Sequence, residues 1–247
     1  MSDKIALVTG GGKRLGAKIA RALAGDGWHV IIHYNSSGTQ ARAIEAAIRE
    51  AGGSASTVQF DLTASDGVKA FADGLGRIDL LVNSASVFEQ DRPEDVEAGR
   101  LEHALRVNLM APVLLGAAMA QQHQARGAGC IINLLDQKLF NLNPDFFSYT
   151  LAKHALLGAT TTMAMALAPR VRVNGIAPGL TLPSGGQSQA EFEQAHRSNP
   201  MQGGSTPEDI VRAVRFIIAT PSMTGETITL DGGEHLMRRL RDVSIEP

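Results

Sequence analysis

The 247-residue sequence has little of several features that commit a chain to a particular class of protein. Its one cysteine, Cys130, cannot form an internal disulfide, and we interpret it as a small buried hydrophobe. No run approaches the roughly 18 uncharged apolar residues that a membrane-spanning helix needs. No secretory segment precedes the first strand-like run, so we expect a cytoplasmic protein that binds no membrane.

A strong excess of charge is missing as well. The net charge is -2 and the pI is near 6.4, which provides no overall electrostatic reason for binding nucleic acid or an anionic membrane. The 7 histidines show no spacing typical of a metal site, so we predict no metal. This composition favours a small-molecule ligand over a macromolecular partner.

Short apolar runs alternate with longer amphipathic ones. Strands are predicted at residues 4–9, 28–34, 54–60, 78–83, 130–135, 171–177 and 226–231. Helices are predicted near residues 14–25, 38–51, 64–75, 99–125, 148–168 and 207–219. The alternation predicts one α/β domain over residues 1–247, a Rossmann-type, doubly wound parallel sheet of about seven strands with helices on both faces. The remaining long segment, 178–206, is rich in Pro, Gly, Ser and Gln and is predicted to be an irregular loop.

Two motifs suggest a binding site at the ends of the strands. The sequence TGGGKRLG, residues 9–16, follows the first strand, and its glycines would let the backbone approach a diphosphate at a helix N-terminus. The alternative for that motif alone is a tight strand-to-helix turn without a ligand. Farther along, Tyr149 and Lys153 lie one helical turn apart, so both project from one face. A nearby ammonium favours tyrosinate, and we therefore expect Lys153 to lower the pKa of Tyr149.

With NSAS at 83–86, Asn108 and APG at 177–179, these motifs resemble the short-chain dehydrogenase/reductase family over essentially the whole chain. Two residues depart from the usual family pattern. Arg14 stands where TGxxxGxG has its middle glycine, and Asp136 stands where a serine normally orients a substrate carbonyl. Together with HYNSS at 33–37 and VRVNGIAPGL at 171–180, both departures resemble the pteridine reductases, including bacterial enzymes that reduce dihydromonapterin and dihydrofolate.

The aspartate is chemically consistent with that branch. A carbonyl that accepts hydride becomes an alkoxide, which an ionised aspartate would repel. Reduction of a ring C=N instead places a proton on nitrogen, and a carboxyl group can hold an N–H or share a proton with Tyr149. The alternative is that Asp136 only caps the following loop. We expect an NADPH-dependent reductase of dihydropteridines; the alternatives are a carbonyl or 3-oxoacyl reductase and a non-catalytic dinucleotide-sensing protein.

The resemblance also implies roles for individual residues. The implied catalytic residues are Asp136, Tyr149, Lys153 and Asn108, and the implied contacts to a pterin or folate are Arg14, Phe88, Asp136 and Tyr149. The implied NADPH-binding residues are Gly10, Lys13, Arg14, Leu15, His33, Ser36, Ser37, Asp61, Leu62, Asn83, Ser84, Ala85, Tyr149, Lys153, Pro178 and Gly179.

Three of these residues have a simpler alternative interpretation. Phe88 could be an ordinary core contact, His33 a strand-end histidine without a ligand, and Arg14 a solvated arginine. NADPH is expected over NADH because HYNSS offers no acidic residue for a ribose 2′-hydroxyl. Residues of the 178–206 loop are expected to select the substrate by the side chain that its pterin ring carries.

Family members commonly pair the helices near 99–125 and 148–168 between subunits, so a homo-oligomer, a homotetramer in particular, is expected.

Overall fold

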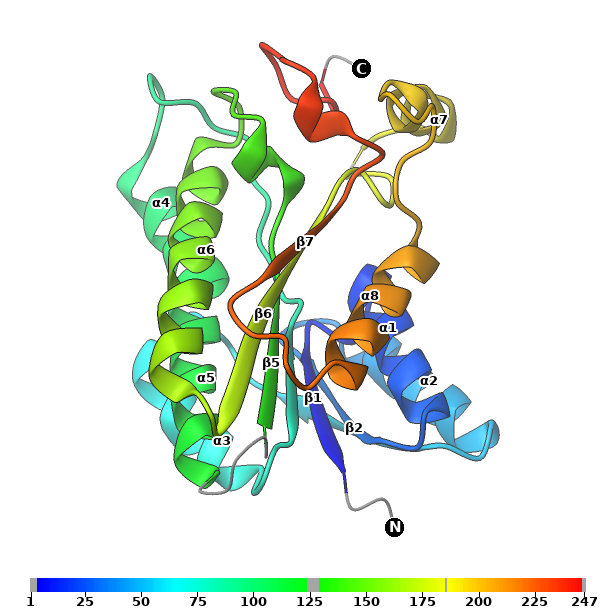
Figure 1. The fold of residues 1–247 in the computed structure, drawn as a ribbon, viewed down its shortest axis with the longest axis vertical. Coiled ribbons are helices and arrows are strands. Elements are labelled where there is room, and N and C mark those ends of the chain that lie inside the picture. Colours follow the sequence, from blue (N-terminus) through cyan, green and yellow to red (C-terminus); the bar gives the residue numbers. More distant parts are fainter. Residues whose placement is uncertain (1–3, 124–128, 185, 246–247) are drawn as a thin grey trace.

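The computed structural model describes residues 4–123, 129–184 and 186–245, and these form one seven-stranded sheet (Figure 1). The order is β3-β2-β1-β4-β5-β6-β7, and every pair of neighbours is parallel. The predicted fold class is therefore confirmed. The strands are β1 (Ile5–Thr9), β2 (His29–Tyr34), β3 (Ser54–Gln59), β4 (Leu80–Asn83), β5 (Gly129–Leu134), β6 (Val171–Pro178) and β7 (Thr227–Leu230).

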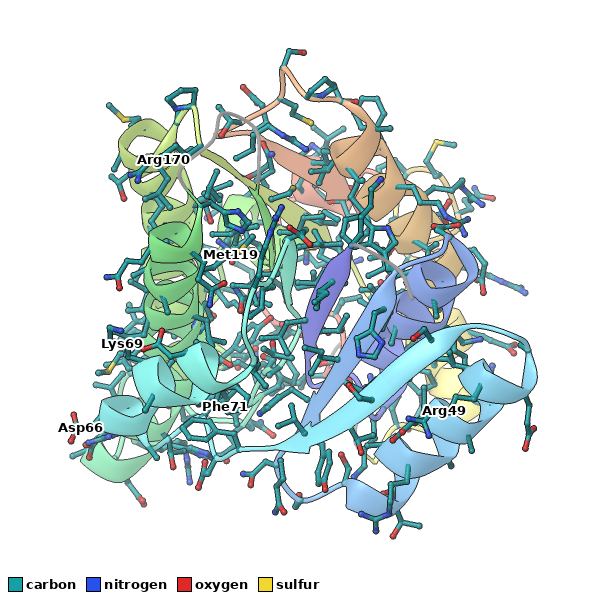
Figure 2. The ribbon with its side chains drawn as sticks, turned by 90° about the horizontal axis from the view of Figure 1, so that it is seen from below. Arg49, Asp66, Lys69, Phe71, Met119 and Arg170 are labelled. Carbon is teal, nitrogen blue, oxygen red and sulfur yellow. The ribbon has the colours of Figure 1, made fainter. Side chains whose placement is uncertain are left out.

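Helices cover both faces of the sheet, as the views in Figures 1 and 2 show. One layer contains α1 (Arg14–Gly25), α2 (Gly38–Glu50) and α8 (Pro207–Ala219). The opposite layer contains α3 (Val68–Gly74), α5 (Ala111–Gln122) and α6 (Phe147–Leu167), with α4 (Ala98–Leu105) beside α6. Right-handed crossovers between parallel strands produce this two-layered cover.

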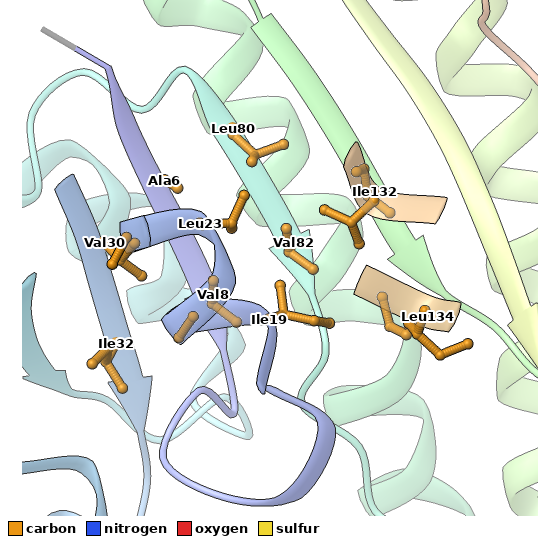
Figure 3. Close-up of a cluster of buried hydrophobic side chains, with 14 of the residues drawn as sticks. Ala6, Val8, Ile19, Leu23, Val30, Ile32, Leu80, Val82, Ile132 and Leu134 are labelled. Carbon is orange, nitrogen blue, oxygen red and sulfur yellow. The ribbon is translucent and has the colours of Figure 1, made fainter. Parts of the chain in front are cut away.

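The alternating side chains of the strands build a separate apolar core on each face. On one face, Ile19 and Leu23 of α1 join a buried cluster with Val8 of β1 and Val82 of β4 (Figure 3). On the other face, the next residue of β1, Leu7, belongs to a second cluster with apolar residues of α3 and α5. Because both faces are buried, the strands read as continuous apolar runs rather than alternating ones.

The strand order places the site. β1 is flanked by β2 on one side and β4 on the other, so the connections leaving β1 and β4 turn in opposite directions and open a crevice at their carboxyl ends. Those ends face the upper edge of the sheet in Figure 1, where α7 (Gln189–Arg197) and the C-terminal segment after β7 also lie.

The helix predicted at 99–125 is present as one helical stretch, Ala98–Gln122, but its hydrogen-bond pattern changes part-way along. After α4 the chain makes a π turn at Arg106–Met110 and then enters α5, which ends at Gln122. Pro112 has no N–H to donate to the carbonyl of Asn108 four residues earlier, and a π turn accommodates that lost hydrogen bond. The last predicted residues, 124–125, lie outside the described residues.

Among the described residues, one helical stretch, Ala98–Gln122, is long and apolar enough to cross a membrane by length and composition. This stretch therefore comes closer to a membrane-spanning helix in length and composition than we expected from the sequence. Within the most apolar window of this stretch, 56% is buried inside the fold, and α5 packs against α3, α6 and β5. Packing within the fold accounts for its apolar composition.

The segment 178–206 is not an irregular loop throughout. It contains α7 (Gln189–Arg197), which begins with a capping box in which Ser188 and Glu191 each bond to the backbone of the other. Such a pair satisfies two free N–H groups of the first turn and stabilises a short helix start. The Ser-x-x-Glu spacing at 188–191 was the signal that could have predicted it.

Candidate active site

A cavity of about 590 Å³ runs along the carboxyl ends of the strands. It extends from the glycine-rich turn after β1 to the end of β5, the start of α6 and the C-terminal segment. Most of the predicted site residues line it: Gly10, Lys13, Arg14, Leu15, His33, Ser36, Ser37, Asp61, Leu62, Ser84, Ala85, Phe88, Asp136, Tyr149, Lys153, Pro178 and Gly179. Asn83 and Asn108 do not.

The glycine-rich turn leaves no room for side chains at two positions. A Cβ on Gly10 would lie 2.9 Å from the Cα of Ala85, and Gly10 has a φ of 65°. A Cβ on Gly16 would lie 2.4 Å from the carbonyl oxygen of Gly10. The turn therefore packs tightly against the β4 loop and presents bare backbone to the cavity, as an anion site at a helix N-terminus requires.

Arg14 opens α1 with an unusual backbone. Its φ is 49°, in the left-handed region that favours glycine, which fits a position where the usual family pattern has glycine. Its Nη1 donates a 2.7 Å hydrogen bond to the carbonyl of Pro183. Arg14, which lines the cavity, therefore connects the glycine-rich turn with the 178–206 segment.

Both ring nitrogens of His33, at the end of β2, are hydrogen-bonded to backbone groups. Its Nδ1 accepts a hydrogen bond from the Gly10 N–H at 3.2 Å, so its Nε2 carries the proton and donates to the Phe60 carbonyl at 3.0 Å. Burial lowers its pKa from 6.5 to about 4. The imidazole is neutral at pH 7 and has no free N–H for a phosphate, so its observed role is to hold the glycine-rich turn.

The low pKa of His33 predicts a stability change in mild acid. Between pH 6.5 and about 4 the unfolded chain binds a proton that the folded chain does not, so the folded state loses stability as the pH falls. The shift is equivalent to about 3 kcal/mol. Urea unfolding at stepped pH should show that loss, and His33→Gln, whose amide can replace both hydrogen bonds, should reduce it. Equal pH dependence in both proteins would contradict the prediction.

The ends of β2 and β3 present polar groups to the cavity. The hydroxyl of Ser37 makes no capping bond to α2, although Ser37 is the residue before that helix. After β3, the Oδ1 of Asp61 accepts from the Thr63 N–H at 2.9 Å. Hydrogen bonds from the backbone and the side chain of Thr63 lower the pKa of Asp61. Asp61 is therefore an ionised group beside Leu62, and Ser36 and Ser37, which carry hydroxyl groups, line the same cavity.

Asn83 and Asn108 lie outside the cavity lining and have structural hydrogen bonds, Asn83 to the neighbouring strand and Asn108 to the loop after β4. The Asn83 amide donates to Asn133 Oδ1 at 2.8 Å inside the sheet. The Asn108 side chain accepts from the Val87 N–H and donates to the Val87 carbonyl, both at 2.9 Å. This pair of bonds fixes the backbone next to Phe88.

Sequence reasoning did not single out Thr9, which also holds this loop. Its hydroxyl oxygen accepts from the N–H groups of Ser84 and Ala85, both at 3.0 Å. The end of β1 therefore fixes the same loop that Asn108 holds from the α4–α5 side.

Phe88 lies at the cavity with 42% of its surface exposed. Its ring stacks on Phe146 at 3.9 Å between centroids and meets the Tyr149 ring edge-on at 4.7 Å. Phe146 is itself buried, with a left-handed φ of 55°. Phe88 is therefore an aromatic wall beside Tyr149 rather than an ordinary core side chain.

Asp136 makes two different hydrogen bonds with its two oxygens. Oδ1 accepts from the Lys138 N–H at 2.8 Å and caps the 3-10 turn η3 (Gln137–Phe140). Oδ2 accepts from the Tyr149 hydroxyl at 2.6 Å. The loop cap and the contact with Tyr149 are thus present together. Burial raises the pKa of Asp136, although the bonds from Tyr149 and Lys138 oppose the shift.

Lys153 lies one turn after Tyr149 on α6. Its Nζ donates to the Leu134 carbonyl at 2.6 Å and lies 5.7 Å from the centroid of the Tyr149 ring. Burial lowers the pKa of Lys153 to about 8. The expectation that Lys153 lowers the pKa of Tyr149 is wrong. Burial of the tyrosine and the adjacent Asp136 raise the pKa of Tyr149 well above its usual value of 10.0. The sequence spacing identified the pair but could not show how deeply it is buried.

The C-terminal segment forms a wall of the cavity that sequence reasoning did not find. Asp242, Val243 and Ser244 line it, next to the turn that follows Asp136. The buried Lys138 Nζ pairs with Asp242 Oδ2 at 2.9 Å, and the Asp242 N–H donates to Asp145 at 2.9 Å. These contacts join residues about a hundred positions apart, so no local pattern marks them.

A model of the short chain dehydrogenase family matches residues 4–194. The chain belongs to this family. Among solved structures, this short-chain dehydrogenase is 42% identical to FolM alternative dihydrofolate reductase 1 from Brucella canis, complexed with NADP. The TM-score is 0.91, and the match covers 98% of this chain and 97% of that one.

Two curated relatives represent different activities within the family. Pteridine reductase 1 of Leishmania tarentolae is 33% identical, over 95% of this chain and 97% of the relative. A 3-oxoacyl-(acyl-carrier-protein) reductase of Synechocystis is 31% identical, over 94% of this chain and 97% of the relative. The short-chain dehydrogenase thus has relatives in the pteridine reductase branch that its motifs resemble, which confirms that resemblance.

Proposed function

We propose that this short-chain dehydrogenase is an NADPH-dependent reductase of dihydropteridines, acting on a ring C=N of a pterin or folate. The observation that carries the proposal is the 2.6 Å hydrogen bond between Tyr149 and Asp136 at the cavity, with Asp136 in place of the usual serine. Similarity to an alternative dihydrofolate reductase and to a pteridine reductase supports the substrate class.

The residues present fit an NADPH molecule. Gly10 and Gly16 line the cavity, and a Cβ at either position would collide with backbone atoms. Only glycine therefore allows this tight turn, whose backbone a diphosphate could approach closely. Ser36 and Ser37 would hold the 2′-phosphate, and Lys153 would hold the nicotinamide ribose. Bound there, NADPH supplies a hydride to the substrate. Similar structures complexed with NADP support this assignment.

The acidic pair can deliver the accompanying proton. Because the pKa of Tyr149 is raised, its hydroxyl does not readily ionise alone. The pKa of Asp136 is raised as well, so its carboxyl group can take up a proton. In that form the hydrogen bond in which Tyr149 donates to Asp136 would reverse, and Asp136 would donate to the phenolic oxygen as Tyr149 donates to the ring nitrogen. One proton then reaches the substrate, and Asp136 rather than Tyr149 is left ionised. Phe88 would stack on the planar heterocycle and orient it.

Cofactor preference gives a direct prediction. NADPH should be used with a higher kcat/KM than NADH, and the double variant Ser36→Ala, Ser37→Ala should lose about 10² or more in kcat/KM with NADPH, because each of the two hydrogen bonds to a charged phosphate is worth roughly 1.5–3 kcal/mol. The same variant should behave like the parent with NADH, which serves as its control. Equal kcat/KM of the parent with both cofactors would overturn the assignment.

A substrate panel tests the proposed function itself. NADPH oxidation is measured with dihydrobiopterin, dihydrofolate and an acetoacetyl thioester. Turnover of a dihydropterin or dihydrofolate with little turnover of the thioester supports the proposal. The reverse pattern would assign a 3-oxoacyl reductase, and binding of NADPH without oxidation on any substrate would assign a sensing protein.

We also propose a cytoplasmic homo-oligomer, a tetramer in particular. Apolar side chains are exposed on the helices expected to pair, including Met110 after α4 and Leu151 and Met165 on α6. Family membership supports such pairing. Light scattering on the purified protein would measure the molar mass, and a monomer of 26.1 kDa would contradict this proposal.

A further inference from the structure

Gln137 has no place in the proton chemistry described above, yet it lines the cavity directly beside Asp136. It is the first residue of η3, and only 7% of its surface is exposed. Its Oε1 is buried and makes no hydrogen bond to any described residue. Most buried polar atoms in proteins have a partner, so such an atom on a residue that lines a cavity calls for an explanation.

The backbone on both sides of Gln137 is fixed. Before it, Asp136 Oδ1 is held by the Lys138 N–H at 2.8 Å, and the Leu139 N–H donates to the Asp136 carbonyl at 3.3 Å. After it, the Lys138 ammonium is paired with Asp242 at 2.9 Å. The amide of Gln137 is therefore carried on a turn that is held on both sides, one residue after Asp136, and both residues line the cavity. A ligand group is better placed than a rearrangement of the turn to satisfy it.

We propose that Gln137 is a specificity-determining residue that hydrogen-bonds the amino-pyrimidine edge of the substrate; this rests on the proposed function. A side-chain amide carries an acceptor and donors in one plane, and an amino-pyrimidine edge presents N–H groups beside ring acceptors in one plane. The pairing has the same geometry as an amide reading a nucleobase edge. The reacting 3-oxoacyl group of a thioester offers acceptors only and leaves the Gln137 oxygen without a donor.

The test compares Gln137→Met with the parent and with Gln121→Met. Met keeps the length of the side chain and removes its polar atoms, and Gln121 is an exposed residue of α5 outside the cavity. For Gln137→Met we expect the KM for a dihydropterin to rise about tenfold with kcat little changed, because the contact is equally present before and during reaction. The KM for NADPH should stay at the parent value, and Gln121→Met should match the parent throughout.

Thermal unfolding separates this role from a structural one. Removal of a buried, unpaired acceptor should leave the midpoint unchanged or higher. A Gln137→Met variant with the parent KM for dihydropterin overturns the inference, and so does one whose KM rises only together with a lowered thermal midpoint. If the parent itself reduces no dihydropterin or dihydrofolate, the proposed function has failed as well, and the panel identifies that case before any variant is made.

Discussion

Tyr149→Phe is expected to lower kcat by about 10² or more while NADPH still binds. The variant keeps the ring that meets Phe88 edge-on and removes only the hydroxyl that donates to Asp136 at 2.6 Å. Without that oxygen, no path is left from the Asp136 carboxyl group to the substrate nitrogen. General acid catalysis by a positioned side chain typically contributes about 10²–10⁴ in rate. Steady-state kinetics at saturating NADPH, with cofactor binding followed by fluorescence, measures both quantities.

Lys153→Met should damage cofactor binding as well as turnover. The ammonium donates to the Leu134 carbonyl and lies over the Tyr149 ring, so its loss removes both the proposed ribose contact and a positive charge beside Asp136. Because its pKa is lowered to about 8, the parent should also show a rising KM for NADPH above that pH. Lys69→Met, on the exposed face of α3, is the matched control.

Two results would contradict this assignment of roles. Near-normal kcat in Tyr149→Phe would remove the hydroxyl from the proton path and leave Asp136 to act directly. A Lys153→Met variant that loses kcat with an unchanged KM for NADPH would show that the ammonium does not bind the cofactor. Its role would then be limited to its effect on Asp136 and Tyr149.

The fold could be predicted from the sequence because its signals are local. Seven apolar runs with helical periodicity between them define the strands, and the parallel sheet follows from the β/α alternation. The ends of α8 at 207 and 219 match the prediction, since Thr206 and Pro207 are strong helix-start signals. The π turn inside the predicted 99–125 helix was not foreseen, although Pro112 was visible in the sequence.

The site could be predicted in part. Asp136, Tyr149 and Lys153 line one cavity, because helical spacing joins the last two and the end of β5 supplies the first. Their pKa directions depend on burial, which no spacing reveals, and so the direction for Tyr149 was wrong. The wall formed by Asp242 depends on contacts between distant segments. His33 was found by position, but its two hydrogen bonds to backbone are a property of the folded turn.

Asp136→Ser is expected to reduce dihydropterin turnover by at least tenfold, equivalent to about 1.4 kcal/mol in the activation barrier, and general acids usually contribute about 10² or more. The serine hydroxyl can still cap η3, but it cannot supply a proton to Tyr149 near neutral pH. The fold should survive, because burial raises the pKa of Asp136 and makes its ionised form unfavourable in the folded protein. Weak reduction of a ketone would be a gain consistent with the restored serine.

Asp136→Asn most directly distinguishes the two roles of Asp136, the capping of η3 and the supply of a proton. Its side-chain oxygen can still accept from the Lys138 N–H, as Asp136 Oδ1 does at 2.8 Å, but the amide carries no transferable proton at these pH values. In the parent, kcat should fall as the pH rises through the raised pKa of Asp136, because the protonated form is the active one. In the Asn variant that dependence should disappear along with most of the turnover. Either variant reducing dihydropterins as fast as the parent, at saturating NADPH and with an unchanged thermal midpoint, would show that Asp136 acts only as a loop cap.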